Sequence, residues 1–73
     1  MPTVDMIATG RNIKDIMKGK GMTAKDIQAV FGFNTPQAIF KWFRGDTIPT
    51  VDNLVILANI FDMKMDDIVV VNK

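Results

Sequence analysis

Hydrophobic residues recur at helical spacing along the chain, in short stretches separated by glycine. In the first stretch, Ile13, Ile16 and Met17 stand three and four residues apart, which is the spacing of one buried helix face. Thr9 precedes them, and its hydroxyl can accept hydrogen bonds from the free backbone N–H groups of a first turn. We therefore expect the first helix to begin at Thr9. We expect it to end at Gly19, because glycine readily adopts the left-handed conformation that closes helices.

The middle of the chain predicts two further helices joined by a tight turn. Thr23 is a capping residue in front of the first of them, and Gly32 ends it. Thr35 can cap the second, with Pro36 at its first helical position, where the missing N–H of proline costs nothing. Gly45 ends this helix. The two apolar faces are Ile27, Val30 and Phe31 in the first helix and Ile39, Trp42 and Phe43 in the second.

A fourth helix is predicted after Thr50, which can cap its first turn. Val55 and Ile56 widen its apolar stripe, which indicates a central helix that is surrounded on nearly all sides. A last helical turn follows Met63. The main apolar side of the fourth helix is formed by Leu54, Leu57, Ala58 and Phe61.

These five short helices predict an all-α fold, a single compact domain over residues 1–73 with its core at about residues 9–70. The carboxyl end of the chain, residues 68–73, is β-branched and weakly helical. Two interpretations are open for it. It can be a frayed last turn packed on the core, or a short strand or apolar tail that joins two copies of the chain.

The residue types that are absent narrow the possible functions. The sequence contains no Cys, His, Ser, Tyr or Glu. The lack of Cys excludes disulfides and thiolate metal sites, and acid–base or nucleophilic catalysis depends largely on the same missing side chains. We therefore expect no enzyme activity, metal, cofactor or small-molecule ligand.

The longest apolar run, Leu54 to Ala58, is far shorter than the ~20 residues of a membrane span. Without a signal peptide, the cytoplasm is the expected location.

Charge is distributed unevenly, although the net charge is only +1. Residues 1–50 carry seven basic and four acidic residues, whereas residues 51–73 carry two basic and four acidic ones. The basic part contains the two helices of the tight turn. Two short helices joined by a glycine-containing turn form the unit that places its second helix in the major groove of DNA.

One face of the third helix carries side chains that can read DNA. They stand at i, i+3, i+4 and i+7, opposite the apolar stripe: Gln37, Phe40, Lys41 and Arg44. Glutamine pairs bidentately with adenine, lysine and arginine reach guanine or phosphate, and an aromatic ring can contact the thymine methyl group. The start of this helix, at Thr35 and Pro36, also offers backbone N–H groups to a phosphate.

Each of these residues also has a plainer interpretation. Gln37 and Lys41 can be ordinary solvated residues, and Arg44 can do no more than neutralise the carboxyl end of its helix. Phe40 can instead wedge against the second helix or belong to a self-association patch, and Phe40 and Phe43 together can anchor a protein partner. The domain would then be a protein-binding helix-turn-helix module, such as an antirepressor or an antitoxin-like partner binder, without a primary role on DNA. The salt dependence of binding separates the two, because phosphate contacts release counterions.

Residues 31–58 carry a specific series of markers and read F-G-F-N-T-P-Q-A-I-F-K-W-F-R-G-D-T-I-P-T-V-D-N-L-V-I-L-A. A helix ends in Gly, a second helix ends in Trp-x-x-Gly, and a short loop with Pro leads to a Leu/Ala-rich helix. In this series the chain resembles the Cro/lambda-repressor-type helix-turn-helix family, also called the XRE family, over about residues 9–70. The resemblance implies a five-helix DNA-binding domain with a recognition helix from about Pro36 to Arg44.

The family pattern also assigns roles by position. Pro36 and Gln37 stand where the family first contacts bases, and Lys41 lies one turn further along the same face. Ala24 and Lys25 stand where the family's second helix approaches phosphate. The resemblance thus predicts sequence-specific binding of double-stranded DNA by a small stand-alone transcriptional regulator, a Cro-like repressor. A single domain touches few base pairs, so we expect a homodimer on two half-sites roughly 34 Å apart.

Three departures from the family pattern concern the seating of the recognition helix. The turn between Gly32 and Ile39 is one residue longer than usual, and Gln28 stands where a small residue is common. Phe43 replaces a frequent Glu. A longer turn and a bulkier side chain can compensate each other, and an exposed Phe43 needs something to pack on.

Overall fold

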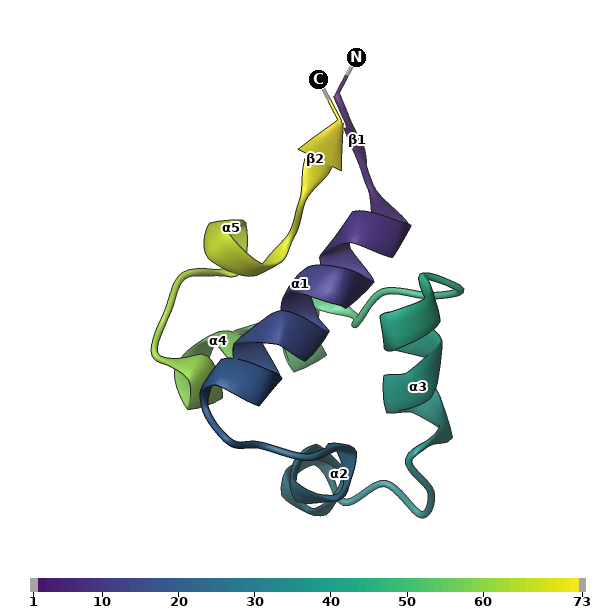
Figure 1. The fold of residues 1–73 in the computed structure, drawn as a ribbon, viewed down its shortest axis with the longest axis vertical. Coiled ribbons are helices and arrows are strands. Elements are labelled where there is room, and N and C mark those ends of the chain that lie inside the picture. The colour runs from purple at the N-terminus through teal and green to yellow at the C-terminus, as the bar shows by residue number, and fades with distance from the viewer. Residues whose placement is uncertain (1, 73) are drawn as a thin grey trace.

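In the computed structural model, which describes residues 2–72, helix α1 crosses the middle of the molecule and the other helices lie around it (Figure 1). The predicted all-α, five-helix fold is confirmed, and the short strands near the two ends of the chain do not change the class. None of the helices among the described residues is both long and apolar enough to cross a membrane. The elements are β1 (Thr3–Val4), α1 (Met6–Gly19), α2 (Ala24–Phe31), α3 (Gln37–Arg44), α4 (Val51–Phe61), α5 (Met65–Ile68) and β2 (Val71–Asn72).

The core is formed by the apolar positions that recur at helical spacing, and each helix contributes to it. The largest side chain that is fully buried is Phe61 of α4. In a chain without Cys, such burial is the main stabilising contribution, at roughly 1.5–3 kcal/mol for each large apolar side chain. The buried set is Ile13, Met17, Ile27, Ile39, Trp42, Leu54, Leu57, Phe61 and Ile68.

The apolar faces of α2 and α4 are narrower than the sequence predicts. Val30 of α2 is 57% exposed, and Val55 and Ile56 of α4 are 52% and 39% exposed. The prediction that α4 is surrounded on nearly all sides is therefore wrong, as is the placement of Val30 on the buried face. Helical spacing reports which residues share a face, but it does not report whether another element covers that face.

The first helix begins three residues earlier than predicted, at Met6, because Asp5 caps it. The Asp5 carboxylate accepts a hydrogen bond from the Ala8 backbone N–H at 2.9 Å. Thr9 is fully buried inside α1. Its hydroxyl accepts from the Val70 N–H at 2.9 Å and donates to the Val70 carbonyl at 3.4 Å. Thr9 therefore holds the end of the chain and does not cap the helix.

The end of the chain forms strand β2, which pairs antiparallel with β1 of the same chain. The interpretation as a frayed helical turn is wrong, and the interpretation as a short strand is confirmed. That the strand joins two copies of the chain stays a prediction. Asn12 supports the same region from α1. Its side-chain amide donates to the carbonyl oxygens of Asp67 and Ile68, at 2.8 and 2.9 Å. These bonds tie α5 to α1.

Helices α1 and α3 approach each other closely at Gly10, which is buried. A Cβ atom added at Gly10 would overlap the backbone carbonyl oxygen of Trp42, and it would also lie 3.1 Å from the Phe43 carbonyl oxygen. Only glycine lets the two backbones meet at this distance. This contact fixes where α3 sits on α1.

Candidate nucleic-acid interface

Helix α2 begins where the sequence predicts, with a capping box between Thr23 and Asp26. The Thr23 hydroxyl accepts from the Asp26 N–H at 3.3 Å, and the Asp26 carboxylate accepts from the Thr23 N–H at 2.9 Å. Ala24 and Lys25 are therefore the first two residues of α2, at the positive end of its dipole. Lys25 is exposed, and Ala24 is half-buried.

The start of the turn between α2 and α3 is held by a hydrogen bond from Gln28. Gly32 ends α2 in the left-handed conformation, with φ at 69°. The Gln28 side-chain amide then donates to the Phe33 carbonyl oxygen at 3.1 Å. The bulkier side chain at position 28 thus anchors the first residue of the turn after Gly32.

An aromatic cluster joins this turn to helix α3. The rings of Phe31 and Phe33 stack with centroids 5.2 Å apart. Both rings meet the buried Trp42 edge-on, at 5.9 and 6.3 Å. Edge-to-face and offset contacts at these distances are favourable arrangements for aromatic rings. The cluster therefore fixes the orientation of α3 from the side of α2, as Gly10 fixes it from the side of α1.

Helix α3 begins at Gln37, one residue later than predicted, with Pro36 at the N-cap position. The Gln37 N–H donates to the Thr35 hydroxyl at 3.4 Å, so Thr35 does serve the first turn, although Pro36 stands outside the helix. A difference of one residue is within the usual variation of helix boundaries. Thr35 is exposed and Pro36 is half-buried.

The structure places four of the six polar or aromatic residues of α3 on one exposed face. Phe40 is 37% exposed, and the side chains of Gln37, Lys41 and Arg44 are exposed as well. On the opposite side, Ile39 and Trp42 are 0% and 4% exposed. The helix ends at Gly45, which adopts a left-handed conformation with φ at 79°. The exposed face consists of Gln37, Phe40, Lys41 and Arg44.

Comparison with known proteins agrees with this geometry. A sequence model described as helix-turn-helix matches residues 13–68, which include α2, the turn, α3, α4 and α5. The chain belongs to the XRE-type helix-turn-helix family. No curated protein and no solved structure gave a significant match.

Membership of this helix-turn-helix family identifies the domain as a DNA-binding domain of the transcription-regulator type. Members of the family are typically not enzymes. The protein-binding alternative, in which Phe40 and Phe43 anchor a partner, is not favoured by this finding. The structure also gives Phe43 a packing role, because it is half-buried and belongs to the apolar residues that lie against the core.

Within this helix-turn-helix domain, Arg44 is held by an ion pair with Asp46. The Arg44 Nε donates to the Asp46 carboxylate at 2.9 Å, and both side chains are 56% exposed. An exposed pair of this kind contributes only about 0–1 kcal/mol. Arg44 can therefore exchange Asp46 for another anion at little cost.

Sequence analysis did not single out the basic residues of α1. Arg11, Lys14 and Lys18 are exposed, and Lys14 lies over the ring of Phe43 on α3, with its Nζ 5.8 Å from the ring centroid. Their spacing of i, i+3 and i+7 was a signal for a shared helix face. The sequence held no signal that this face adjoins α3, since the contact joins segments about 30 residues apart.

Proposed function

We propose that this protein binds specific duplex DNA sequences as a small stand-alone transcriptional regulator, a Cro-like repressor. The recognition helix, about Pro36 to Arg44, would lie in the major groove. The observation that carries the proposal is the exposed face of α3, whose amide and basic side chains can bond base edges and stand on a helix fixed from two sides. A rigid support matters, because base readout needs side chains held in register with the base edges.

Each residue of the interface has a role that follows from its chemistry. Gln37, at the start of α3, pairs bidentately with adenine, while Lys41 and Arg44 reach guanine or phosphate. Phe40 contacts a thymine methyl group. The remaining residues position the domain on the phosphate backbone, where contacts fix the register but do not read sequence. These positioning residues are Ala24, Lys25 and Thr35, whereas Pro36 stands with Gln37 where the family first contacts bases.

Repression requires no surface beyond the DNA-binding one, because a protein in the major groove excludes other proteins from the same base pairs. We also propose that two copies bind one operator as a homodimer, on half-sites roughly 34 Å apart. Support comes from the small size of α3, which has eight residues. One such helix reads only a few base pairs, so a second copy is needed for a specific site.

An NMR titration tests the proposed function. Isotope-labelled protein is titrated with a duplex of about 20 base pairs, at low and at raised salt, and amide shifts are recorded. We expect salt-sensitive shifts at Lys25, at residues 35–41 and at Arg44, because phosphate contacts weaken steeply as salt rises. Shifts that are absent at millimolar DNA would contradict a role on DNA. If the expected shifts appear, selection from a random-sequence library would supply the operator.

Replacement of the acidic partner of Arg44 provides a second test. We expect Asp46→Asn to raise the affinity for the selected operator several-fold, because it removes a negative charge beside the DNA and frees Arg44 for a phosphate. The change should barely alter the melting temperature, since the exposed ion pair contributes little. Binding is measured by fluorescence anisotropy. Asp62→Asn, which removes a charge at the end of α4, is the matched control and should leave the affinity unchanged.

A further inference from the structure

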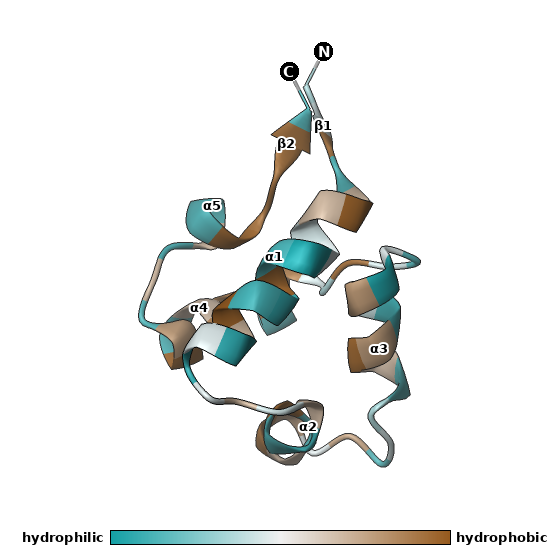
Figure 2. Ribbon diagram, viewed as in Figure 1, coloured by the Kyte–Doolittle hydropathy of each residue, from teal (hydrophilic) through white to brown (hydrophobic). Residues whose placement is uncertain are grey.

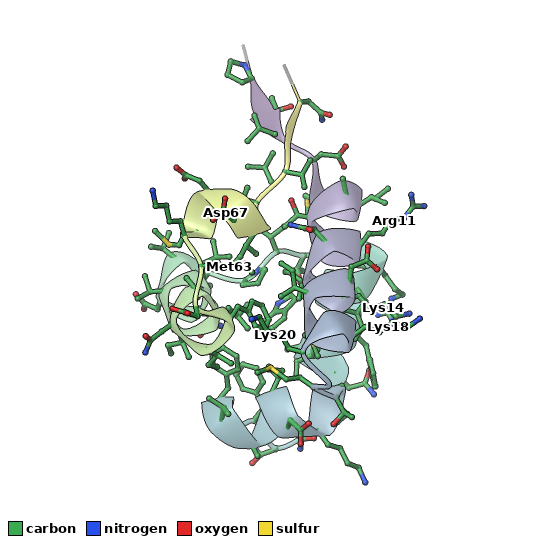
Figure 3. All side chains as sticks on the ribbon, turned by 60° about the vertical axis from the view of Figure 1, so that its left-hand side comes forward. Arg11, Lys14, Lys18, Lys20, Met63 and Asp67 are labelled. Carbon is green, nitrogen blue, oxygen red and sulfur yellow. The ribbon has the colours of Figure 1, made fainter. Side chains whose placement is uncertain are left out.

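Helix α1 exposes a row of three basic residues that the proposed recognition face does not include. Arg11, Lys14 and Lys18 are all exposed, and at 100° per residue their positions fall within about 60° of one another around the helix. In Figure 3 the three side chains lie on the same side of α1, whereas Lys20 lies on the other side. We call these three residues the α1 basic ridge. The viewer-facing side of α1 also carries hydrophilic segments in Figure 2.

The α1 basic ridge has no acidic partner in the part of the chain that the structure describes. Within residues 2–72, the ion pair present is Arg44 with Asp46. Asp15 lies beside the ridge in sequence, but it forms no ion pair with Arg11, Lys14 or Lys18. Like charges three and four residues apart destabilise a helix slightly. Asp15 stands four residues from Arg11 and three from Lys18, so the ridge and this carboxylate together carry a net charge of +2.

The α1 basic ridge directly adjoins the recognition helix. Lys14 lies over the ring of Phe43, and this ring is 6.2 Å from that of Phe40 on the exposed face of α3. The same region borders the start of α2. A surface hollow of about 310 Å³ is lined by Lys14, Met17, Lys18, Met22, Ala24 and Phe43. The ridge, the start of α2 and the face of α3 therefore form one continuous surface.

From this continuity and from its charge, we infer that the α1 basic ridge binds the phosphate backbone beside the major groove that α3 occupies. The inference rests on the proposed function and extends it to a helix outside the helix-turn-helix unit. From Arg11 to Lys18, α1 rises about 10 Å. One DNA strand presents a phosphate about every 3.4 Å along the duplex axis. The ridge is long enough to meet two or three successive phosphates of one strand.

Two double variants test the inference. K14Q/K18Q removes two charges from the ridge, and K20Q/K64Q removes two charges elsewhere, so both lower the net charge equally. Lys20 lies on the other side of α1 (Figure 3), and Lys64 directly precedes α5, which lies on the opposite side of α1 from α3 (Figure 1). Glutamine has a helix propensity close to that of lysine. Melting temperatures confirm that both variants fold. Affinity for a random-sequence duplex of about 20 base pairs is measured across salt concentrations.

We expect K14Q/K18Q to flatten the plot of log affinity against log salt by about 1.8, at 0.9 for each lost phosphate contact, while K20Q/K64Q keeps the wild-type slope. Between about 50 and 200 mM salt, this makes the fall in affinity about twelvefold smaller. Arg11→Gln should flatten the slope by about another 0.9. The preferred base sequence should stay the same in all variants, because phosphate contacts do not read bases.

Failure of the inference is distinguishable from failure of the proposed function. If the wild-type protein binds no duplex, the proposed function fails and the inference with it. If the wild-type protein binds with a steep salt dependence and the two double variants share its slope, only the inference is overturned. In that case, binding of a polyglutamate peptide that K14Q/K18Q abolishes would assign the ridge to an acidic protein.

Discussion

Gly10→Ala is expected to lower the free energy of unfolding by about 3 kcal/mol, at the upper end of the usual cost of overpacking. The added methyl group would overlap the Trp42 carbonyl oxygen. A backbone atom cannot swing away as the end of a side chain can, so α1 and α3 must separate. For a domain of this size, the loss corresponds to a fall in melting temperature of about 15 °C. Thermal unfolding followed by circular dichroism measures it.

The same helix supplies a matched control for this substitution. Gly19 is the last residue of α1, and a Cβ atom there would have nothing within 4 Å. Gly19→Ala should leave the protein unchanged or stabilise it by up to about 1 kcal/mol, because alanine is the better helix former. Equal melting temperatures for Gly10→Ala and the wild-type protein would contradict the close contact of α1 and α3. DNA binding should fall together with stability, since this contact also sets the position of α3.

Gln37→Ala is expected to reduce the affinity for the selected operator by about tenfold to a hundredfold, the range for loss of one bidentate base contact. It should also relax the preference for adenine at one position in each half-site. The slope of log affinity against log salt should stay at the wild-type value, since Gln37 carries no charge and releases no counterions. Anisotropy titrations with the operator and with single-base variants measure all three quantities.

A polar residue on another helix is the control for Gln37. Asn59 is exposed on α4, and Asn59→Ala should change neither the affinity nor the preferred sequence. Two results would contradict base readout by Gln37. One is an unchanged base preference in Gln37→Ala, and the other is a fall in affinity that is equal for every duplex. The second result would place Gln37 on the phosphate backbone, where contacts act alike on all sequences.

The sequence alone predicted what depends on neighbouring residues. Helix periodicity identified the buried apolar residues of α1 to α4, from Ile13 to Phe61, because a helix has a fixed 3.6-residue repeat, although it also placed Val30 on a buried face. The capping box of Thr23 and the left-handed Gly32 and Gly45 also followed from local chemistry. For the same reason, the polar face of α3 was visible in the sequence, since its residues lie within two turns of one helix.

Two of the predictions from local signals were wrong, because packing decided the outcome. Asp5 and Thr9 are both good capping residues, and Asp5 is the cap because Thr9 is needed in the interior to bond Val70. In the same way, Val55 and Ile56 continue an apolar stripe that no neighbouring element fully covers. Helix propensity and periodicity carry no information on where a segment distant in the sequence lies. The position of such segments decides which residue caps α1 and which apolar residues are covered.

The chain by itself thus determined the helices, most of their buried positions, the polar face of α3 and the family. Only the tertiary structure decided how these parts face one another. The contact at Gly10 sets α1 against α3 and so brings the α1 basic ridge next to Phe43 and the start of α2. The bonds of Thr9 and Asn12 return the end of the chain to α1. The physical reason is that local patterns fix dihedral angles and faces, whereas burial and backbone contact between distant segments fix their arrangement.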